Sequence, residues 1–322
     1  MAPIGVVVAQ LGGPERLADV EGFIRSIFAD PRLVPLPGGP KTRSALSALV
    51  SRVRARRVRS RYEAIGGGSP IVTTTQHQAD ALAVELDARG HDVVVAVAHR
   101  HSTPDTSSAV EVLLREGVDH IILLPLFPQY SGTTTGSSEA ELVRLLSERR
   151  ADVSLDVIRS WCEHPSYLDQ QAQLVDDMLA SMPAQDPSQA LVVFSAHGLP
   201  QRIVDRGDPY LEEVEATVAG VMKRLERSVD HVLAFQSRAG PVKWLGPDVR
   251  DVVAEAAASG RTWLGVVPIS FVSDHLETLH ELDIELKAHA EVAGIYQFHR
   301  CKCLDVGSGV GPMLADIVEE YL

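Results

Sequence analysis

The stretch ALVVFSAHGLP, residues 190–200, decides the fold class of this chain. Its apolar residues run from Ala190 to Phe194 without polar alternation, which is typical of a strand buried on both faces of a parallel sheet. The strand signal ends at His197, before a loop that begins with Gly198. Open α/β sheets bind ligands at the carboxyl ends of their strands. His197 is therefore either a structural histidine or a candidate general base.

Strand and helix signals alternate along the rest of the chain. This alternation predicts right-handed βαβ units and a doubly wound α/β fold with parallel sheets. The further strand candidates are residues 4–11, 92–99, 120–127, 155–161, 231–237 and 262–271. The helical patterns are residues 74–89, 107–117, 137–150, 167–182, 210–227 and 276–290.

The length of the chain predicts two packed lobes. Its 322 residues, 45% of them hydrophobic, exceed one ordinary domain and can bury a large core. We expect one lobe over residues 1–162 and a second over residues 163–322, so that each has its own strand–helix series. The sequence leaves open whether the final helix packs back on the first lobe.

Composition excludes several classes of protein. A formal net charge of −13 argues against a general nucleic-acid-binding protein. No stretch approaches the 18 consecutive apolar residues of a membrane-spanning helix, and the N-terminal run has no basic flank, which indicates a first strand rather than a signal peptide. Three cysteines argue against a disulfide framework, so we expect a reducing compartment, the cytoplasm.

Several segments of the first half are candidates for ligand contact. LGGP at residues 11–14 is either a tight turn or a close approach of the backbone to a ligand. Residues 51–62 contain six arginines on a helical pattern, which form either a solvated basic face or a site for carboxylates or an anionic membrane surface. IGGGSP at 65–70 can hold an anion but lacks the lysine of a P-loop. In PQYSGTTTGSS at 128–138, Ser137 or Ser138 is the expected N-cap of the next helix.

A second group of polar residues follows the strand candidate at 262–271. Asp274 and Glu277 have the spacing of a capping box, which is a structural explanation for Glu277. Together with His197 and His275 they also form a candidate proton and cation site. They do not have the ligand spacing of a closed zinc site.

Taken together, these segments resemble the ferrochelatase family over essentially the whole chain. The resemblance implies two Rossmann-like lobes with a porphyrin cleft between them. It also implies an enzyme that inserts Fe²⁺ into a porphyrin in heme biosynthesis, with release of two protons. The matching stretches, in the family's order, are LGGPERLADVEGFI, RYEAIGGGSPI, PQYSGTTTGSS, FSAHGLPQRIVDRGDPY, FQSRAGPVKWLGP and VPISFVSDHLETLHELDIE.

The resemblance also implies roles for individual residues. His197 matches the histidine that takes pyrrole protons or meets the metal, and Glu277, with Asp274 and His275, matches the acidic path opposite. His197 and Glu277 are the implied metal contacts. The implied porphyrin contacts are the apolar Leu11, Ile65, Trp244 and Phe271, the propionate-binding Arg54, Ser69 and Ser237, and the further positions Tyr62, Arg100 and Tyr130.

Two departures from the family pattern concern a hydroxyl group and a cofactor. Phe127 stands where many relatives carry a tyrosine, and Gly132 stands at the position of one relative's cluster cysteine. Cys162, Cys301 and Cys303 cannot complete a four-cysteine [2Fe–2S] site, although a cluster with one other ligand stays open. We expect no permanent cofactor, since iron is the substrate.

Some alternatives remain open at the level of sequence. Oxygen and imidazole ligands do not enforce iron, so a cobalt or nickel tetrapyrrole chelatase is one alternative, and a tetrapyrrole-binding or heme-delivery protein without turnover is another. LGGPE and SDHLETL resemble the corresponding stretches of relatives that use protoporphyrin, and this resemblance favours protoporphyrin IX over coproporphyrin III. The apolar and basic stretch 33–57 is either a lid over the cleft or a surface for peripheral contact with the inner membrane.

Overall fold

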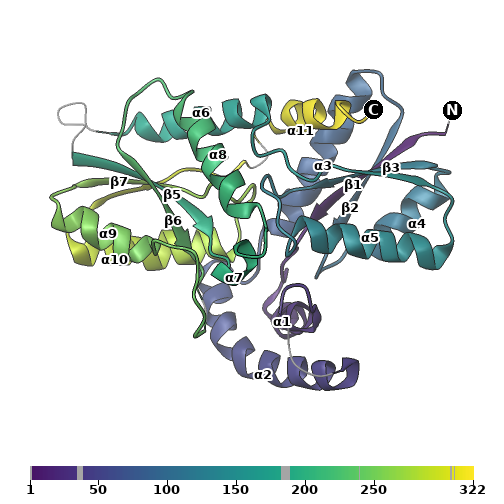
Figure 1. Ribbon diagram of the computed structural model, residues 1–322, viewed down its shortest axis with the longest axis horizontal. Coiled ribbons are helices and arrows are strands. Elements are labelled where there is room, and N and C mark those ends of the chain that lie inside the picture. The colour runs from purple at the N-terminus through teal and green to yellow at the C-terminus, as the bar shows by residue number, and fades with distance from the viewer. Residues whose placement is uncertain (1, 35–38, 183–188, 239, 305–306, 308) are drawn as a thin grey trace. The chain divides into compact units, whose positions relative to one another are not determined.

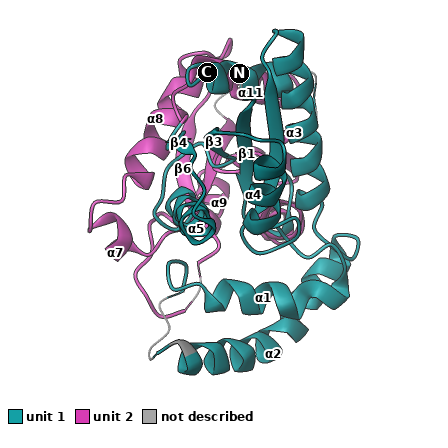
Figure 2. Ribbon diagram, turned by 90° about the vertical axis from the view of Figure 1, so that its right-hand side faces the viewer, with its two compact units in different colours: residues 1–160, 273–276, 306–322 teal, residues 161–272, 277–305 magenta. Residues whose placement is uncertain are grey.

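The computed structural model describes residues 2–34, 39–182, 189–238, 240–304, 307 and 309–322, and it divides the chain into two compact units (Figures 1 and 2). The first change of unit follows Ser160, and two later segments return to unit 1. The boundary expected after residue 162 lies two residues beyond this first change, and it does not include the two later segments of unit 1. Unit 1 comprises residues 1–160, 273–276 and 306–322, and unit 2 comprises residues 161–272 and 277–305.

Unit 1 is built on a four-stranded parallel sheet in the order β2-β1-β3-β4. The continuous apolar runs form its strands, and β1 is buried along almost its whole length. The strand expected over 155–161 is shorter, and its residues alternate in exposure as an edge strand allows. The strands are β1 (Ile4–Gln10), β2 (Val93–His99), β3 (His120–Pro125) and β4 (Ser154–Val157).

Helices cover both faces of this sheet (Figure 1). Helices α4 (Thr106–Arg115) and α5 (Thr135–Arg149) close one face over a Val, Leu and Ile core. Helix α3 (Ile71–Ala88) lies on the other face and packs against the C-terminal helix α11 (Val310–Glu319). Arg89 joins the two helices through ion pairs of 2.8 Å to Asp316 and 2.6 Å to Glu319, so α11 packs on unit 1.

A helix pair lies beyond the carboxyl end of β1, away from the sheet (Figures 1 and 2). It consists of α1 (Val20–Ala29) and α2 (Pro40–Ala64), preceded by the 3-10 turn η1 (Leu17–Asp19). The helix predicted for the arginine-rich segment is confirmed as part of α2. The pair is held by a small apolar cluster of Val20, Ile24, Ala55 and Tyr62, with Leu17, Phe28, Val58, Ile65 and Leu276 packed around it.

Unit 2 repeats the strand order of unit 1, a similarity that no sequence repeat revealed. Its parallel sheet has the order β6-β5-β7-β8, with β5 and β7 in the centre. The strand expected over 262–271 ends before Pro268, and β8 was not predicted because it is a four-residue edge strand without an apolar run. The strands are β5 (Ala190–His197), β6 (His231–Gln236), β7 (Trp263–Val267) and β8 (Gln297–Arg300).

The helices of unit 2 include one segment of unusual winding. The helix predicted over 276–290 is in fact a π-helix, η3 (Glu277–Leu286), continued by α10 (Lys287–Ala293). Together with α9 (Val249–Ala258), which was not predicted, they pack on one face of the sheet. The remaining helices are α6 (Pro165–Leu179), α7 (Gln201–Val204) and α8 (Tyr210–Met222), the last ending five residues before the predicted residue 227.

The strand order fixes where a site can form in unit 2. The chain leaves β5 toward β6 on one side and later returns to β7 on the other side. The point between β5 and β7 is therefore a topological switch point, where α/β sheets of this kind bind ligands at the carboxyl ends of strands. His197 ends β5 at this point. Among the residues that the structure describes, no helix has the length and apolarity that crossing a membrane requires.

Candidate active site

The backbone around His197 is held from three sides. Its N–H donates to Ser270 Oγ at 3.0 Å, and its carbonyl accepts a hydrogen bond of 3.0 Å from the Tyr210 hydroxyl. A side chain at Gly198 would bring a Cβ to within 2.8 Å of the Gln236 carbonyl oxygen. The loop after β5 can therefore turn this closely beside β6 only with glycine at position 198.

The imidazole of His197 pairs with Glu277 at the start of η3. Nδ1 lies 2.7 Å from Glu277 Oε2, and both side chains are only partly exposed, 37% and 24%. Because a carboxylate accepts hydrogen bonds, Nδ1 carries the proton and Nε2 presents its lone pair. The Phe271 ring stands edge-on to the imidazole, with ring centroids 6.4 Å apart. The arrangement orients a basic nitrogen.

Ser237, directly after β6, joins two carboxylates of the π-helix. Its Oγ lies 2.7 Å from Glu277 Oε2 and 2.6 Å from Glu281 Oε2. A hydroxyl has one proton to donate, so it cannot donate to both carboxylates at once. If both short contacts are hydrogen bonds, one of the two carboxylates must carry a proton and donate it to Ser237 Oγ. The cluster can therefore hold a proton between Glu277 and Glu281.

Gln236, the last residue of β6, contacts both Glu277 and Glu281 through its side-chain amide. It is almost fully buried, and its Oε1 accepts a hydrogen bond of 2.7 Å from Ser195 Oγ. Its Nε2 donates to the Glu277 carbonyl at 3.0 Å and approaches Glu281 Oε2 at 3.5 Å. Since Oε1 is fixed by the serine, the amide must present its N–H groups to the π-helix.

The charge of Glu277 controls the basicity of His197. Burial by itself would lower the pKa of His197, because it disfavours the charged imidazolium. The negative charge of Glu277, its hydrogen bond to Nδ1 and the further charge of Glu281 outweigh burial, and together they raise the pKa of His197 above its ordinary value. The imidazole is therefore a stronger base than a free histidine.

Two residues of this polar cluster were not predicted from the sequence. Glu281 and Gln236 were not singled out, although Glu277 and Glu281 have the four-residue spacing of a shared helix face. That spacing was the available signal for Glu281. Gln236 offered no local signal, because its partners lie 41 and 45 residues away along the chain. π-Helices are rare and are frequent at functional sites.

The carboxylate of Glu277 has partners outside the capping box that the sequence suggests. The helix begins after Asp274, and Glu277 Oε2 lies 2.7 Å from His197 Nδ1 and 2.7 Å from Ser237 Oγ. The capping role of Asp274 and Glu277 stays a prediction. Residues 273–276 also belong to unit 1, whereas Glu277 belongs to unit 2. In unit 1, His275 Nδ1 lies 3.1 Å from the Ser273 carbonyl oxygen.

In unit 1 the partly exposed Arg100 forms an ion pair with the buried Asp30. Arg100 Nη2 lies 2.7 Å from Asp30 Oδ2, and Ser137 Oγ donates to the same oxygen at 3.0 Å. Ser137 also accepts from Arg100 Nε at 3.0 Å. The expected N-cap role of Ser137 or Ser138 is wrong, because α5 begins at Thr135. Ser137 instead fixes the guanidinium of Arg100.

The glycine loops of unit 1 pack against one another. Gly12 has φ +83°, and a Cβ there would meet Ser102 Oγ at 2.4 Å. A Cβ on Gly13 would meet the Ser69 side chain, and the N–H of Ser69 donates to the Pro14 carbonyl at 2.8 Å. Leu11 at the start of this turn is half-buried. The tight-turn interpretation of residues 11–14 thus accounts for these two glycines.

The other proposed porphyrin contacts lie in different surroundings. Tyr62 is buried in the α1–α2 cluster with Ile65 beside it, whereas Arg54 is exposed, with its guanidinium 5.0 Å from the centre of the Phe28 ring. The Tyr130 hydroxyl lies over Gly136. In unit 2, Trp244 pairs its backbone with Pro200, next to the His197 loop.

Similarity to solved structures identifies the class of the fold. SirB from Bacillus subtilis with Fe³⁺ matches with a TM-score of 0.55 and 16% identity over 76% of this chain and 88% of that chain. DR2241 from Deinococcus radiodurans, described as structurally similar to chelatases, matches with a TM-score of 0.55 and 13% identity over 100% of this chain and 56% of that chain. The fold is thus the two-unit α/β fold of chelatases, and the expected fold class is confirmed.

Sequence comparison then gives the family. The family Ferrochelatase matches residues 3–322. The ferrochelatase of Synechococcus sp. (strain RCC307) is 43% identical over 325 residues, which cover 100% of this chain and 83% of that protein. That of Gloeobacter violaceus is 40% identical over 325 residues, covering 100% and 98%. The chain belongs to the ferrochelatase family. It is a lyase, a metal chelatase that inserts iron into a porphyrin in heme biosynthesis.

Proposed function

We propose that His197, Glu277, Ser237 and Glu281 are the proton- and metal-handling centre of iron insertion in this chain. The observation that carries the proposal is the 2.7 Å contact between His197 Nδ1 and Glu277 Oε2, with Ser237 bridging on to Glu281. Glu277 fixes the tautomer, so that Nε2 is the basic atom. A general base with a pKa near the working pH is the group that such a reaction needs.

The free-base porphyrin loses two pyrrole protons, and His197 Nε2 accepts them one at a time. The imidazolium that forms is stabilised by the carboxylate of Glu277. The imidazolium then gives its Nδ1 proton to Glu277, and Ser237 Oγ connects Glu277 Oε2 to Glu281 Oε2 by contacts of hydrogen-bond length. Before the second transfer, Nε2 releases its proton to water and Nδ1 regains one, which restores the basic lone pair of Nε2. The same carboxylates can replace water around the incoming Fe²⁺.

The porphyrin contacts are proposed on the strength of the family resemblance together with side-chain chemistry. Arg54 offers an exposed guanidinium for a propionate, and carboxylates are bound well by charge-assisted hydrogen bonds of this kind. Ser69 and Arg100 are the further polar groups, with Leu11, Tyr62, Ile65, Tyr130, Trp244 and Phe271 as contacts to the macrocycle. The resemblance assigns Ser237 to a propionate, and we propose it for the proton path as well, because its hydroxyl contacts Glu277 and Glu281. Asp274 and His275 complete the proposed acidic side.

We propose further properties of the enzyme that concern its substrate, its cofactors and its location. The porphyrin is protoporphyrin IX rather than coproporphyrin III, as the sequence resemblance favours. The enzyme carries no permanent cofactor and no [2Fe–2S] cluster. It works in the cytoplasm, does not bind nucleic acid, and contacts the inner membrane peripherally through α2 and the segment before it.

The deciding experiment is an insertion assay with both porphyrins and Fe²⁺, Co²⁺ and Ni²⁺ in competition, on the wild type and on His197→Ala. We expect insertion to be fastest with protoporphyrin IX and Fe²⁺. His197→Ala should lose about 10²–10⁴ in rate while still binding porphyrin, because a general base is removed. Near-normal turnover of His197→Ala would end the assignment of the base.

A further inference from the structure

Two side chains hold the backbone of His197 beyond the point where the ladder between β5 and β7 ends. The last paired residues of this ladder are Phe194 and Val267. One further hydrogen bond of 3.0 Å follows, from the Ile269 N–H to the Ser195 carbonyl. Alternate residues of a strand turn their backbone groups to the same side, so His197 turns its N–H and carbonyl to the side where β7 has ended. Both groups therefore need partners from outside the ladder.

Ser270 and Tyr210 supply these partners. The N–H of His197 donates to Ser270 Oγ, and the Tyr210 hydroxyl donates to the carbonyl of His197, each at 3.0 Å. Ser270 and Tyr210 also form a side-chain hydrogen bond with each other. Because the tyrosine proton is already given to His197, the serine hydroxyl donates in this bond and the tyrosine oxygen accepts. The three hydrogen bonds close a ring in which each hydroxyl donates once and accepts once.

The surroundings of Tyr210 keep its phenol in this role. Tyr210 is 6% exposed at the start of α8, where its N–H donates to Asp208 Oδ1 at 3.1 Å. Burial, together with the charge of Glu277, raises the pKa of Tyr210 well above its ordinary value, so the hydroxyl keeps its proton at neutral pH. The phenol is therefore a permanent donor to the carbonyl of His197.

The position of the His197 backbone decides whether the imidazole reaches Glu277. The contact between His197 Nδ1 and Glu277 Oε2 joins the end of β5 to the start of η3, and it is 2.7 Å long. Because a charge-assisted hydrogen bond is short and directional, a backbone shift of part of an ångström weakens it. Burial lowers the pKa of His197, and the charge of Glu277 with its hydrogen bond raises it above the ordinary value. A weaker contact therefore makes Nε2 a weaker base.

We propose that Tyr210 and Ser270 are positioning residues for iron insertion, which hold the backbone of His197 so that its imidazole stays paired with Glu277. In this role neither side chain contacts the reacting atoms. The inference rests on the proposed function of His197 as the base.

The test is the variant Tyr210→Phe of the full chain, with Tyr167→Phe as its matched control. Tyr167 is also buried, and its hydroxyl donates to the carbonyl of Ile269 at 3.2 Å, so both variants remove the same kind of bond from unit 2. His197 is titrated without substrate by NMR of protein with isotopically labelled histidine. Tyr210→Phe should weaken proton binding by His197 about threefold or more, whereas Tyr167→Phe should change it less than about 1.5-fold. Urea denaturation checks that both variants fold.

Insertion kinetics give a second readout. Tyr210→Phe should lower kcat about tenfold while KM for the porphyrin stays within about twofold, because a misplaced base affects the chemical step rather than binding. The acidic limb of its pH–rate profile should move to lower pH together with the titration of His197. Ser270→Ala opens the same ring and should act in the same direction. The double variant should lose less than the sum of the two single losses, because the residues share one ring of hydrogen bonds.

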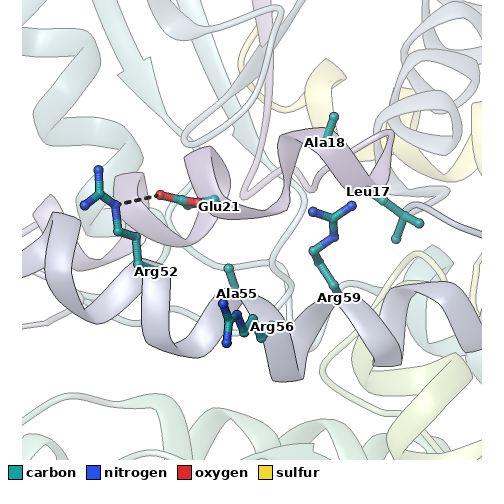
Figure 3. Close-up of a pocket in the computed structure, with 7 residues that line it drawn as sticks. All are labelled: Leu17, Ala18, Glu21, Arg52, Ala55, Arg56 and Arg59. Carbon is teal, nitrogen blue, oxygen red and sulfur yellow. Dashed lines mark ion pairs between the residues drawn. The ribbon is translucent and has the colours of Figure 1, made fainter.

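A second control lies in unit 1. Arg56→Gln alters the lining of a small cavity between α2 and residues 17–21, where three arginines follow one another along α2 (Figure 3). It removes an exposed charge outside unit 2, and salt screens such a charge, so the titration of His197 should not change. A shift in Arg56→Gln as large as that in Tyr210→Phe would overturn the proposal.

The variant His197→Ala separates failure of this inference from failure of the proposed function. Normal insertion by His197→Ala would remove the base, and the positioning role with it. An inactive His197→Ala, together with a Tyr210→Phe that matches Tyr167→Phe in titration and in rate, would overturn the positioning role alone.

Discussion

His197 and Glu277 are 80 residues apart in the chain, and their side chains meet at 2.7 Å at the carboxyl ends of the central strands of unit 2. The pairing makes Glu277 the group that sets both the tautomer and the basicity of His197. Losing the carboxylate charge should therefore change how the reaction depends on pH, not only its rate.

Glu277→Gln should move the acidic limb of the pH–rate profile to lower pH and reduce the maximal rate. His197 must be neutral to accept a proton, so activity rises as pH passes through its raised pKa. Glutamine removes the charge that raises this pKa, and burial then lowers it. The same ion pair affects the stability of the fold in the opposite direction as pH changes. The pairing stabilises the fold below the pH where an unfolded histidine titrates, and this advantage is lost as pH rises through the folded pKa. An unchanged pH profile in Glu277→Gln would show that Glu277 does not act through His197.

Ser237→Ala and Ser237→Gly separate the hydroxyl group from the backbone. Ser237 has φ +64°, a left-handed conformation that costs a non-glycine residue about 1–2 kcal/mol. Both variants remove the hydrogen bonds to Glu277 and Glu281, so both should lower the insertion rate, about tenfold or more. Only glycine relaxes the backbone, so Ser237→Gly should be the more stable of the two in chemical denaturation. Normal insertion by either variant would remove Ser237 from the proton path.

Arg54→Ala should weaken porphyrin binding by about 1.5–3 kcal/mol, the value of a hydrogen bond to a charged group. Fluorescence titration with the porphyrin measures this, and Arg57→Ala is the control. The dimethyl ester of the porphyrin should bind wild type and Arg54→Ala equally. The guanidinium of Arg54 also stands over Phe28, so the melting temperature is recorded to detect lost packing. If Arg54→Ala binds the free acid as tightly as Arg57→Ala does, Arg54 does not hold a propionate.

Two buried histidines should make unit 1 sensitive to acid. Burial lowers the pKa of His99 to about 4, and it lowers the pKa of His101 to about 4 as well, with a further contribution from the charge of Arg100. The unfolded chain takes up these protons near pH 6.5, whereas the folded chain does so only near pH 4. Stability should therefore fall between pH 6.5 and 4, by up to about 3 kcal/mol for each histidine.

Urea denaturation across this pH range tests the acid sensitivity. His101→Gln can retain the hydrogen bond to Ser26, which His101 Nδ1 makes at 2.8 Å, but it does not titrate. It should flatten the decline between pH 6.5 and 4. The exposed His77 offers a control, His77→Gln, with an unchanged decline. A decline of the same size in all three proteins would assign the acid sensitivity to other groups.

Protein purified without oxygen should contain no acid-labile sulfide. Cys162, Cys301 and Cys303 are all buried, and burial raises the pKa of the Cys301 thiol to about 12, which disfavours the thiolate that a cluster needs. Iron and sulfide analysis together with visible absorption gives the answer. About two irons and two sulfides per chain would contradict the expectation.

Local pattern in the sequence determined the class of the fold and most of its strands and helices. Continuous apolar runs can be buried only inside a sheet with both faces covered, so they indicate parallel strands without knowledge of their partners. The same reasoning placed His197 at the carboxyl end of β5, where a ligand site forms. The short edge strand β8 had no such run and was missed.

Only the tertiary structure decided which polar groups meet. Ser137 was a plausible cap by its neighbours in sequence, yet its hydroxyl binds Asp30, 107 residues away. Glu277 fitted a capping box in sequence, and only the folded unit brings its carboxylate and that of Glu281 to Ser237. An α-helix and a π-helix are built from the same residue types, so the sequence does not distinguish them. A hydrogen bond between residues far apart in the chain depends on which strands lie side by side, which local sequence does not show. The packing of the whole unit decides which polar side chains meet, because a buried polar group is stable only where a hydrogen-bond partner lies within reach.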